Sequence, residues 1–140
     1  MYILDTDHLS LIQRNGIAGQ QIRSKLSRVS RDKAATTIVS YEEQVKGRLA
    51  MLSRAKTPQD VLSAYAWLRQ LAEDYREIVI LSFDAAALLE HQQLRKRYPR
   101  LGTMDLKIAA ISITRQAILL TRNQSDFGQV TELVCEDWSI

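Results

Sequence analysis

Short β-favouring runs alternate with amphipathic stretches along this chain. We predict strands at residues 2–4, 36–39, 78–81, 117–120 and 133–135. Each run is short and continuous rather than alternating, which is typical of strands covered by helices on both faces. The pattern therefore predicts an α/β fold.

The clearest helical period follows Pro58, a favourable residue in a first helical turn. Apolar positions recur at three- and four-residue steps from 61 to 75 and predict an amphipathic helix. Further helices are predicted at about 84–98 and from near Thr103. Three aromatic residues follow the helical spacing, so we expect them to be packing residues of the helix rather than a base-stacking platform: Tyr65, Trp67 and Tyr75.

Strands that alternate with helices imply right-handed crossovers and a mostly parallel sheet between helical layers. In open sheets of this kind, ligands bind outside the carboxyl ends of the strands. The chain has 140 residues, close to the usual size of one domain, so residues 1–140 are predicted to form a single domain. The search for chemistry therefore begins with polar residues that follow strands or start helices.

Composition narrows the class of protein further. Apolar residues make up 46% of the chain and charged residues 25%, with 5 Gly and 2 Pro, which excludes collagen-like and disordered classes. The single cysteine, Cys135, cannot form an internal disulfide, and no signal-peptide pattern opens the sequence, so we expect a cytoplasmic protein. The apolar runs are far shorter than the roughly 20 residues of a membrane span, so no membrane association is expected.

Charge is distributed unevenly along the chain. Residues 14–56 hold ten basic and three acidic residues, a net charge of +7, whereas the remainder carries −4 and the whole chain +3. A cationic segment of this kind favours a surface that binds a polyanion, with the basic residues on phosphates. Charge-rich helices that are simply solvated are the commoner explanation of such a pattern.

Acidic residues stand at the ends of several predicted elements. Asp5 and Asp7 follow the first strand, and Glu42 and Glu43 follow the second. The other two are Asp105, in a first helical turn, and Asp126, after the fourth strand. Taken singly, most have a structural explanation, such as a capping box between Ser40 and Glu43 or a favourable dipole at a helix start.

The acids carry more information as a set. In a parallel sheet they would meet at one edge, where converging carboxylates repel one another unless a cation intervenes. Oxygen ligands without Cys or His select hard cations, so we predict Mg²⁺ or Mn²⁺ rather than Zn²⁺. The natural chemistry of such a site is phosphodiester hydrolysis.

At these residues the sequence resembles the PIN-domain ribonucleases, specifically the VapC-type toxins of bacterial toxin–antitoxin pairs. Four motifs carry the resemblance in the family's order, together with a closing acidic-Trp pair. They are Leu4-Asp5-Thr6-Asp7, Glu43 with Gly47, Asp105 with Ile108-Ala109-Ala110, Leu119-x-Thr121-x-Asn123-x-x-Asp126-Phe127, and Asp137-Trp138. The resemblance covers nearly the whole chain.

The resemblance implies a PIN-like three-layer α/β/α sandwich with a metal-dependent endoribonuclease site, a toxin that blocks translation, a cognate antitoxin and a homodimer. It assigns the metal and the catalysis to Asp5, Glu43, Asp105 and Asp126, with Thr121 and Asn123 as supporting polar residues. Asp7 would be a further ligand or a charge behind the ligands. The chain departs from the pattern at Gln44, where the family usually has an apolar residue, and at Glu42, a competing carboxylate.

Other functions fit parts of the sequence. Asp5-Thr6-Asp7 after a strand is similar to the nucleophile loop of haloacid-dehalogenase phosphatases, with Asp5 as nucleophile and Asp7 as acid/base. A receiver-like phosphorylation switch would need a lysine after a late strand, where this chain has none. A PIN fold that only binds RNA or a partner is a third alternative. The two histidines, His8 and His91, are expected on helix surfaces or in caps.

Overall fold

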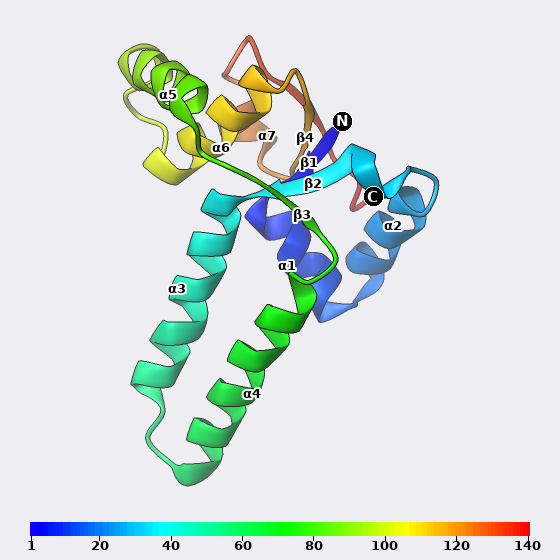
Figure 1. The fold of residues 1–140 in the computed structure, drawn as a ribbon, viewed down its shortest axis with the longest axis vertical. Coiled ribbons are helices and arrows are strands. Elements are labelled where there is room, and N and C mark those ends of the chain that lie inside the picture. The colour runs from blue at the N-terminus through cyan, green and yellow to red at the C-terminus, as the bar shows by residue number, and fades with distance from the viewer.

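A computed structural model describes residues 1–140, and its centre is one parallel sheet (Figure 1). The sheet has five strands in the order β3-β2-β1-β4-β5, and every neighbouring pair is parallel. The strands are β1 (Tyr2–Leu4), β2 (Ala34–Thr37), β3 (Val79–Leu81), β4 (Ile118–Leu120) and β5 (Val134–Glu136). The predicted parallel sheet is confirmed.

Helices cover both faces of this sheet. They are α1 (Thr6–Arg14), α2 (Ile17–Leu26), α3 (Ile38–Arg54), α4 (Pro58–Asp74), α5 (Ala85–Arg97), α6 (Thr103–Thr114) and α7 (Gln124–Phe127), with a 3₁₀ turn, η1, at Arg31–Lys33. No helix has the length and apolar character that crossing a membrane would require.

The core divides into two clusters, one on each face of the sheet. Consecutive side chains of a strand point to opposite faces, so Ile3 packs with α5, α6 and α7 while Leu4 packs with α1, α2 and α4. Leu119 and Leu120 on the neighbouring strand divide in the same way. Two helical layers around a central sheet make the three-layer α/β/α sandwich that was predicted.

The second strand lies two residues earlier than its predicted position at 36–39. Thr37 ends β2 and caps α3, because its hydroxyl accepts the N–H of Ser40 at 3.1 Å. Val39 therefore belongs to the first turn of α3, from which it packs in the core. The predicted capping box is wrong for the same reason, since Ser40 lies inside α3 rather than at its cap.

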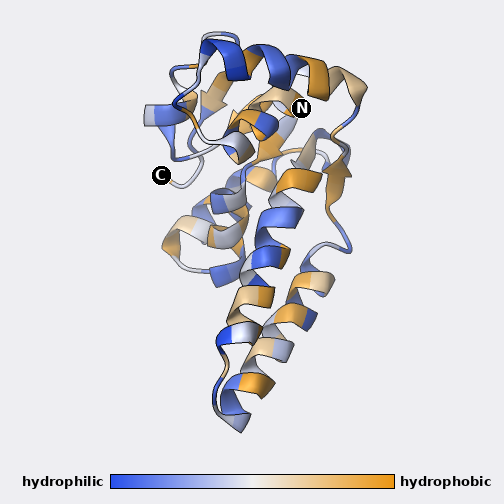
Figure 2. Ribbon diagram, turned by 90° about the vertical axis from the view of Figure 1, so that its left-hand side faces the viewer, coloured by the Kyte–Doolittle hydropathy of each residue, from blue (hydrophilic) through white to orange (hydrophobic).

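Helices α3 and α4 form an antiparallel hairpin that projects from the sheet (Figures 1 and 2). Because the hairpin has little of the protein around it, several apolar side chains on it face solvent. Tyr65 is 56% exposed and Trp67 is 45% exposed, so helix packing buries neither of these two predicted packing residues. Tyr75, at the end of α4 near the sheet, is buried as predicted.

At Gly19, helices α1 and α2 pack too closely to leave room for a side chain. A Cβ on Gly19 would lie 2.2 Å from the carbonyl oxygen of Leu11, well inside van der Waals contact. Between the helices, Asn15 takes the left-handed conformation (φ 53°) and caps the end of α1. This close packing fixes the helix that carries residues 6–8 beside the end of β1.

Candidate active site

The four predicted acids lie at the carboxyl edge of the sheet. Asp5 directly follows β1, Glu43 is on the second turn of α3, Asp105 is in the first turn of α6, and Asp126 is on α7 after β4. Because every strand is parallel, the segments that follow β1, β2 and β4 emerge at the same edge.

Asp105 shows that these acids lie near one another. The pKa of its carboxyl is raised to about 6, first by burial and then by the negative charges of Glu43, Asp126 and Asp5 in that order. Each of the three is thus close enough to disfavour ionisation of Asp105. The other carboxylate on α3, Glu42, is exposed and pairs with Lys46 at 3.0 Å, so Glu43 is the residue that joins the cluster.

The donor atoms of this acidic cluster suit a hard divalent cation. All are carboxylate oxygens, the ligands that Mg²⁺ and Mn²⁺ prefer. No three His, Cys, Asp or Glu side chains are gathered into a set that could hold an ion as they stand. The effect of the other acids on Asp105 is compatible with this, because charges interact over about 4–6 Å, whereas a coordination bond is only about 2.1 Å long.

Hydrogen bonds orient Asp5 and Glu43 within the acidic cluster. Asp5 is 5% exposed and caps α1, its Oδ1 accepting the N–H of His8 at 2.7 Å. The hydroxyl of Thr6 donates to Glu43 Oε1 at 2.7 Å. This contact joins the first motif to the second and gives Thr6 a role in the site that the sequence reading did not assign, although Thr6 lies inside the Leu4–Asp7 motif.

Hydrogen bonds link Thr121 and Asn123, the two predicted supporting residues, to the turn that carries Asp126. Asn123 Nδ2 donates to Asp126 Oδ2 at 3.1 Å, and the Asn123 side-chain oxygen caps α7. The hydroxyl of Thr121, a fully buried residue, accepts the N–H of Asn123 at 2.9 Å. The fourth motif is therefore a hydrogen-bonded turn that presents Asp126 at the sheet edge.

Gln44 departs from the family pattern for a reason visible in its surroundings. Its side chain is buried, and its Oε1 accepts the hydroxyl of Tyr75 at 2.7 Å. Its Nε2 donates to Gln13 Oε1 at 2.9 Å. An apolar residue would leave the Tyr75 hydroxyl, whose pKa is raised by burial, without this acceptor.

Asp7 is held by Arg122 at the rim of the site. Two guanidinium nitrogens of Arg122 lie 2.7 and 3.1 Å from the two Asp7 carboxylate oxygens, a bidentate pair that raises the pKa of Arg122. Both Asp7 oxygens are thus bound by Arg122, and the role of Asp7 as a ligand or a charge behind the ligands stays a prediction. About half of the Arg122 side chain stays exposed.

The two histidines differ in their positions. His8 is fully buried beside Asp5, so its expected place on a helix surface is wrong. Its Nε2 accepts the backbone N–H of Trp138 at 3.2 Å, which brings the C-terminal segment behind the site. His91 lies on α5, where its ring meets Phe83 edge-on and burial lowers its pKa.

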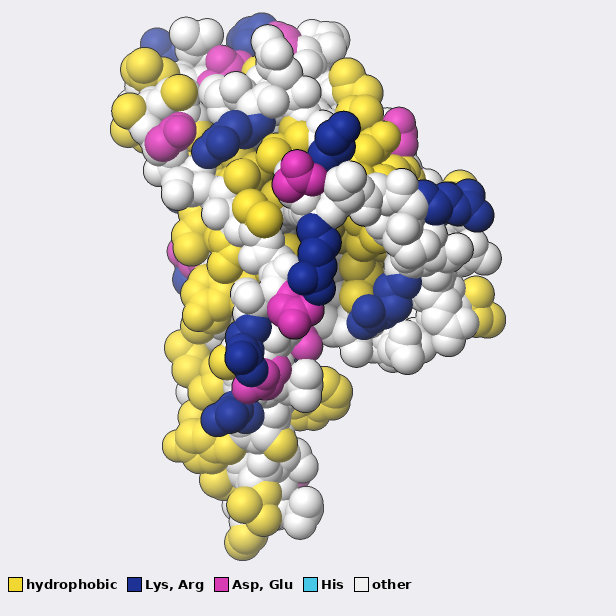
Figure 3. Space-filling model, turned by 45° about the vertical axis from the view of Figure 1, so that its right-hand side comes forward, with side chains coloured by type: hydrophobic (Ala, Val, Ile, Leu, Met, Phe, Trp, Pro, Cys, Tyr) yellow, Lys and Arg dark blue, Asp and Glu magenta, His cyan; other side chains and the backbone are white.

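The basic residues of the first third do not all lie beside the acidic cluster. Arg31 lies in η1, before β2 and thus at the opposite edge of the sheet, and it pairs with Glu77 at 2.8 Å. Figure 3 shows basic and acidic side chains alternating over one face of the molecule. Phosphate binding by the first third stays a prediction, and Arg122, outside that segment, is a further cation close to Asp5 and Asp7.

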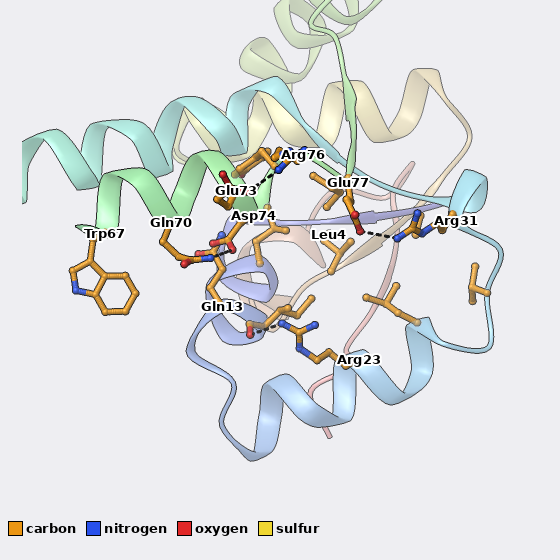
Figure 4. A pocket seen from close by; sticks show the side chains of 17 residues that line it. Leu4, Gln13, Arg23, Arg31, Trp67, Gln70, Glu73, Asp74, Arg76 and Glu77 are labelled. Carbon is orange, nitrogen blue, oxygen red and sulfur yellow. Dashed lines mark hydrogen bonds and ion pairs between the residues drawn. The ribbon is translucent and has the colours of Figure 1, made fainter. Parts of the chain in front are cut away.

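A groove of about 700 Å³ lies between α4 and the pair α1 and α2, away from the acidic cluster (Figure 4). None of the four acids lines it. Its apolar lining includes Leu9, Ile12, Leu26 and Trp67. Charged side chains surround these residues, among them Arg23, Arg31, Glu73 and Glu77.

Comparison with known proteins gives consistent matches over the full length. A model of the PIN domain family matches residues 2–133. The chain is 22% identical over 152 residues to Ribonuclease VapC1 of Haemophilus influenzae strain R2866, covering 99% of this chain and 98% of the relative. The structure of VapBC-1 from nontypeable Haemophilus influenzae matches with a TM-score of 0.78 and 21% identity over 99% of this chain and 98% of that chain. VapBC2 from Rickettsia felis, bound to a DNA fragment from its promoter, gives 0.73 at 21% identity, covering 98% of both chains.

Proposed function

Because the chain belongs to the PIN-domain family, we propose that it is a metal-dependent endoribonuclease that hydrolyses phosphodiester bonds of RNA. The observation that supports this most is the gathering of Asp5, Glu43, Asp105 and Asp126 at the carboxyl edge of the parallel sheet, where burial and the three neighbouring charges raise the pKa of Asp105. A relative aligned over 99% of this chain is named a ribonuclease.

In this proposal Asp5, Glu43, Asp105 and Asp126 hold Mg²⁺ or Mn²⁺. The bound cation would lower the pKa of a water molecule and neutralise charge on the attacked phosphate. Thr6 and Asn123 hold Glu43 and Asp126 in orientation through their hydrogen bonds. Arg122, fixed by Asp7 and exposed to solvent, offers its guanidinium to a phosphate of the RNA.

The structure disfavours the phosphatase alternative. That mechanism needs Asp7 as a free acid/base, whereas both Asp7 oxygens are bound by Arg122. A PIN module that only binds RNA would not need four acids at one sheet edge. Both alternatives give different outcomes in the assay that follows.

Protein purified free of any antitoxin should cleave structured RNA with Mg²⁺ or Mn²⁺, stop on addition of EDTA and resume with excess Mn²⁺. The expected cause is loss of the cation that the acidic cluster holds. Gel analysis of end-labelled RNA measures this directly. RNA that is bound but uncut with either metal would favour the binding module, and hydrolysis of small phosphomonoesters without RNA cleavage would favour the phosphatase.

We further propose that the protein is the toxin of a toxin–antitoxin pair. The solved structures with the same fold include the VapBC assemblies of Haemophilus influenzae and Rickettsia felis. The groove between α4 and α1–α2 suits an amphipathic antitoxin segment, because its apolar floor has a charged border. The homodimer that the resemblance implies stays a prediction.

Trp67→Ala is expected to weaken binding of the antitoxin at least about tenfold, because large aromatic residues in a groove carry much of the binding energy. The protein encoded by the adjacent reading frame is the ligand, and titration calorimetry is the measurement. Tyr65→Ala is the matched control, since Tyr65 is exposed on the same helix but does not line the groove. Equal affinity of the parent and the Trp67 variant would place the antitoxin elsewhere.

A further inference from the structure

His8 lies between a proposed catalytic carboxylate and the end of the chain. It is fully buried in the first turn of α1. One ring nitrogen, Nδ1, is 3.6 Å from Asp5 Oδ1, and the other, Nε2, accepts the backbone N–H of Trp138 at 3.2 Å. The ring therefore spans the space between Asp5 and the C-terminal segment.

The contact with Trp138 decides which ring nitrogen carries the hydrogen. A backbone N–H can only donate, so Nε2 must present a lone pair and the hydrogen must be on Nδ1. Nδ1 has no hydrogen-bond partner within the usual limit, although it is completely buried. The nearest carboxylate oxygen to this donor is Asp5 Oδ1, just beyond hydrogen-bond distance at 3.6 Å.

The C-terminal segment has further anchors besides His8, whose Nε2 also lies 3.7 Å from Asp137 Oδ1. The Trp138 ring packs on Tyr2 with centroids 4.6 Å apart, and its indole N–H donates to Glu136 at 2.7 Å. Asp137 Oδ1 accepts both the N–H and the hydroxyl of Ser139, at 2.8 and 2.5 Å. These contacts fix the Trp138 backbone N–H in place and, through it, the orientation of the His8 ring.

We propose that His8 is a positioning residue for Asp5, because its buried and unpartnered Nδ1 faces Asp5 Oδ1 at 3.6 Å and its backbone N–H binds the same oxygen. Both donors of His8, the backbone N–H and Nδ1–H, face Oδ1, while Oδ2 of Asp5 accepts no hydrogen bond from the protein. His8 thus leaves one carboxylate oxygen available and makes the docked C-terminal segment part of the support of the site. The proposal rests on the proposed nuclease function.

Two substitutions each keep one contact of the His8 ring and remove the other. In His8→Asn the side-chain amide occupies the position of Nδ1, so it can donate to Asp5 but cannot reach Trp138. In His8→Gln the amide extends to the position of Nε2, so it can accept from Trp138 but has no donor beside Asp5. His91→Asn, on α5 away from the acidic cluster, is the control for loss of a histidine.

We expect the two variants to rank in opposite orders for stability and for function. His8→Gln should melt at a higher temperature than His8→Asn, because it keeps the C-terminal contact and fills more of the buried space. His8→Asn should bind Mn²⁺ within about threefold of the parent, whereas His8→Gln should bind at least about tenfold more weakly and lose RNA cleavage by a similar factor. A purely structural role predicts instead that binding and cleavage follow the melting temperature, and that result would overturn the proposal.

Nitrogen-resolved NMR of the imidazole tests the geometry without any activity. With only two histidines in the chain, the His91→Asn protein leaves one ring to observe. The Nδ1–H tautomer is expected, and an Nε2–H tautomer or a doubly protonated ring would overturn the proposal. A parent protein that shows this tautomer and binds Mn²⁺ but cuts no RNA would count against the proposed function alone.

Discussion

Asp5→Asn is expected to reduce RNA cleavage at least about a thousandfold while the protein stays folded. Loss of a metal-binding charge removes several kcal/mol of transition-state stabilisation, and about 4 kcal/mol corresponds to that factor. Asparagine caps a helix as well as aspartate does, and it can still accept the N–H of His8 that Asp5 accepts at 2.7 Å. Single-turnover cleavage rates and thermal melting measure the two effects, and expression without the antitoxin should arrest growth for the parent alone.

Asp84→Asn is the matched control for Asp5→Asn. Asp84 caps α5 in the same manner, its Oδ1 accepting the N–H of Ala87 at 2.9 Å, and its charge is not among those that raise the pKa of Asp105. We expect the Asp84→Asn variant to cleave RNA at the same rate as the parent protein. Equal cleavage by the Asp5 variant and the parent would remove Asp5 from the catalytic site and, with it, the proposed mechanism.

Asp105→Asn should abolish cleavage to a similar extent and should make the metal-free protein more stable. The folded state raises the pKa of Asp105 from 3.8 to about 6, through burial and then the charges of Glu43, Asp126 and Asp5. Folding therefore becomes less favourable as the pH rises through this interval, because the unfolded chain gives up the proton more readily. Asparagine has no proton to lose and avoids this cost at neutral pH.

The expected gain is about 1 kcal/mol at pH 7.5, discounted because Asp105 is only partly buried and water screens its charge. For a chain of this size that corresponds to a rise of about 3 °C in melting temperature. The measurement is melting in EDTA at pH 7.5 and pH 4, with the gain expected only at the higher pH.

Asp60→Asn is the control that distinguishes the effect of the neighbouring acids on stability from the effect of the helix dipole. Asp60 is the third residue of α4, as Asp105 is of α6, but it is exposed and far from the other acids in sequence. Loss of its charge should destabilise the protein slightly, by about 0.5 kcal/mol, because a first-turn carboxylate favours the dipole. If Asp60→Asn and Asp105→Asn both lose stability at pH 7.5, the acids around Asp105 do not destabilise the folded protein.

The central strands β1 and β4 could be predicted because their residues are apolar and mostly buried, with side chains on both faces of the sheet. Ile3 and Leu4 enter different core clusters on opposite sides of the sheet, which is why the run shows no alternation. The boundary at Thr37 could not be predicted in the same way. Thr37 and Val39 both favour strands, and only the hydrogen bond from Ser40 shows that the helix has already begun.

Exposed aromatic residues on α4 show a limit of helical periodicity. The helical period of this segment predicts that Tyr65 and Trp67, two residues apart, point in different directions, but it does not say what lies opposite either side chain. The hairpin of α3 and α4 extends beyond the sheet, so part of an apolar stripe meets solvent and the groove instead of the core. What covers a helix is a property of the whole fold.

For the candidate site, the sequence by itself determined the residue types and their order. The carboxylates after β1, β2 and β4 must share an edge once the strands are parallel, because parallel strands all end on the same side. The tertiary structure alone decided what each side chain does there. Arg122 binds Asp7, Thr6 orients Glu43, and Trp138 fixes His8 behind Asp5, through contacts between residues up to 130 positions apart. Such pairings depend on where the chain returns in space, and no local pattern of residues records that.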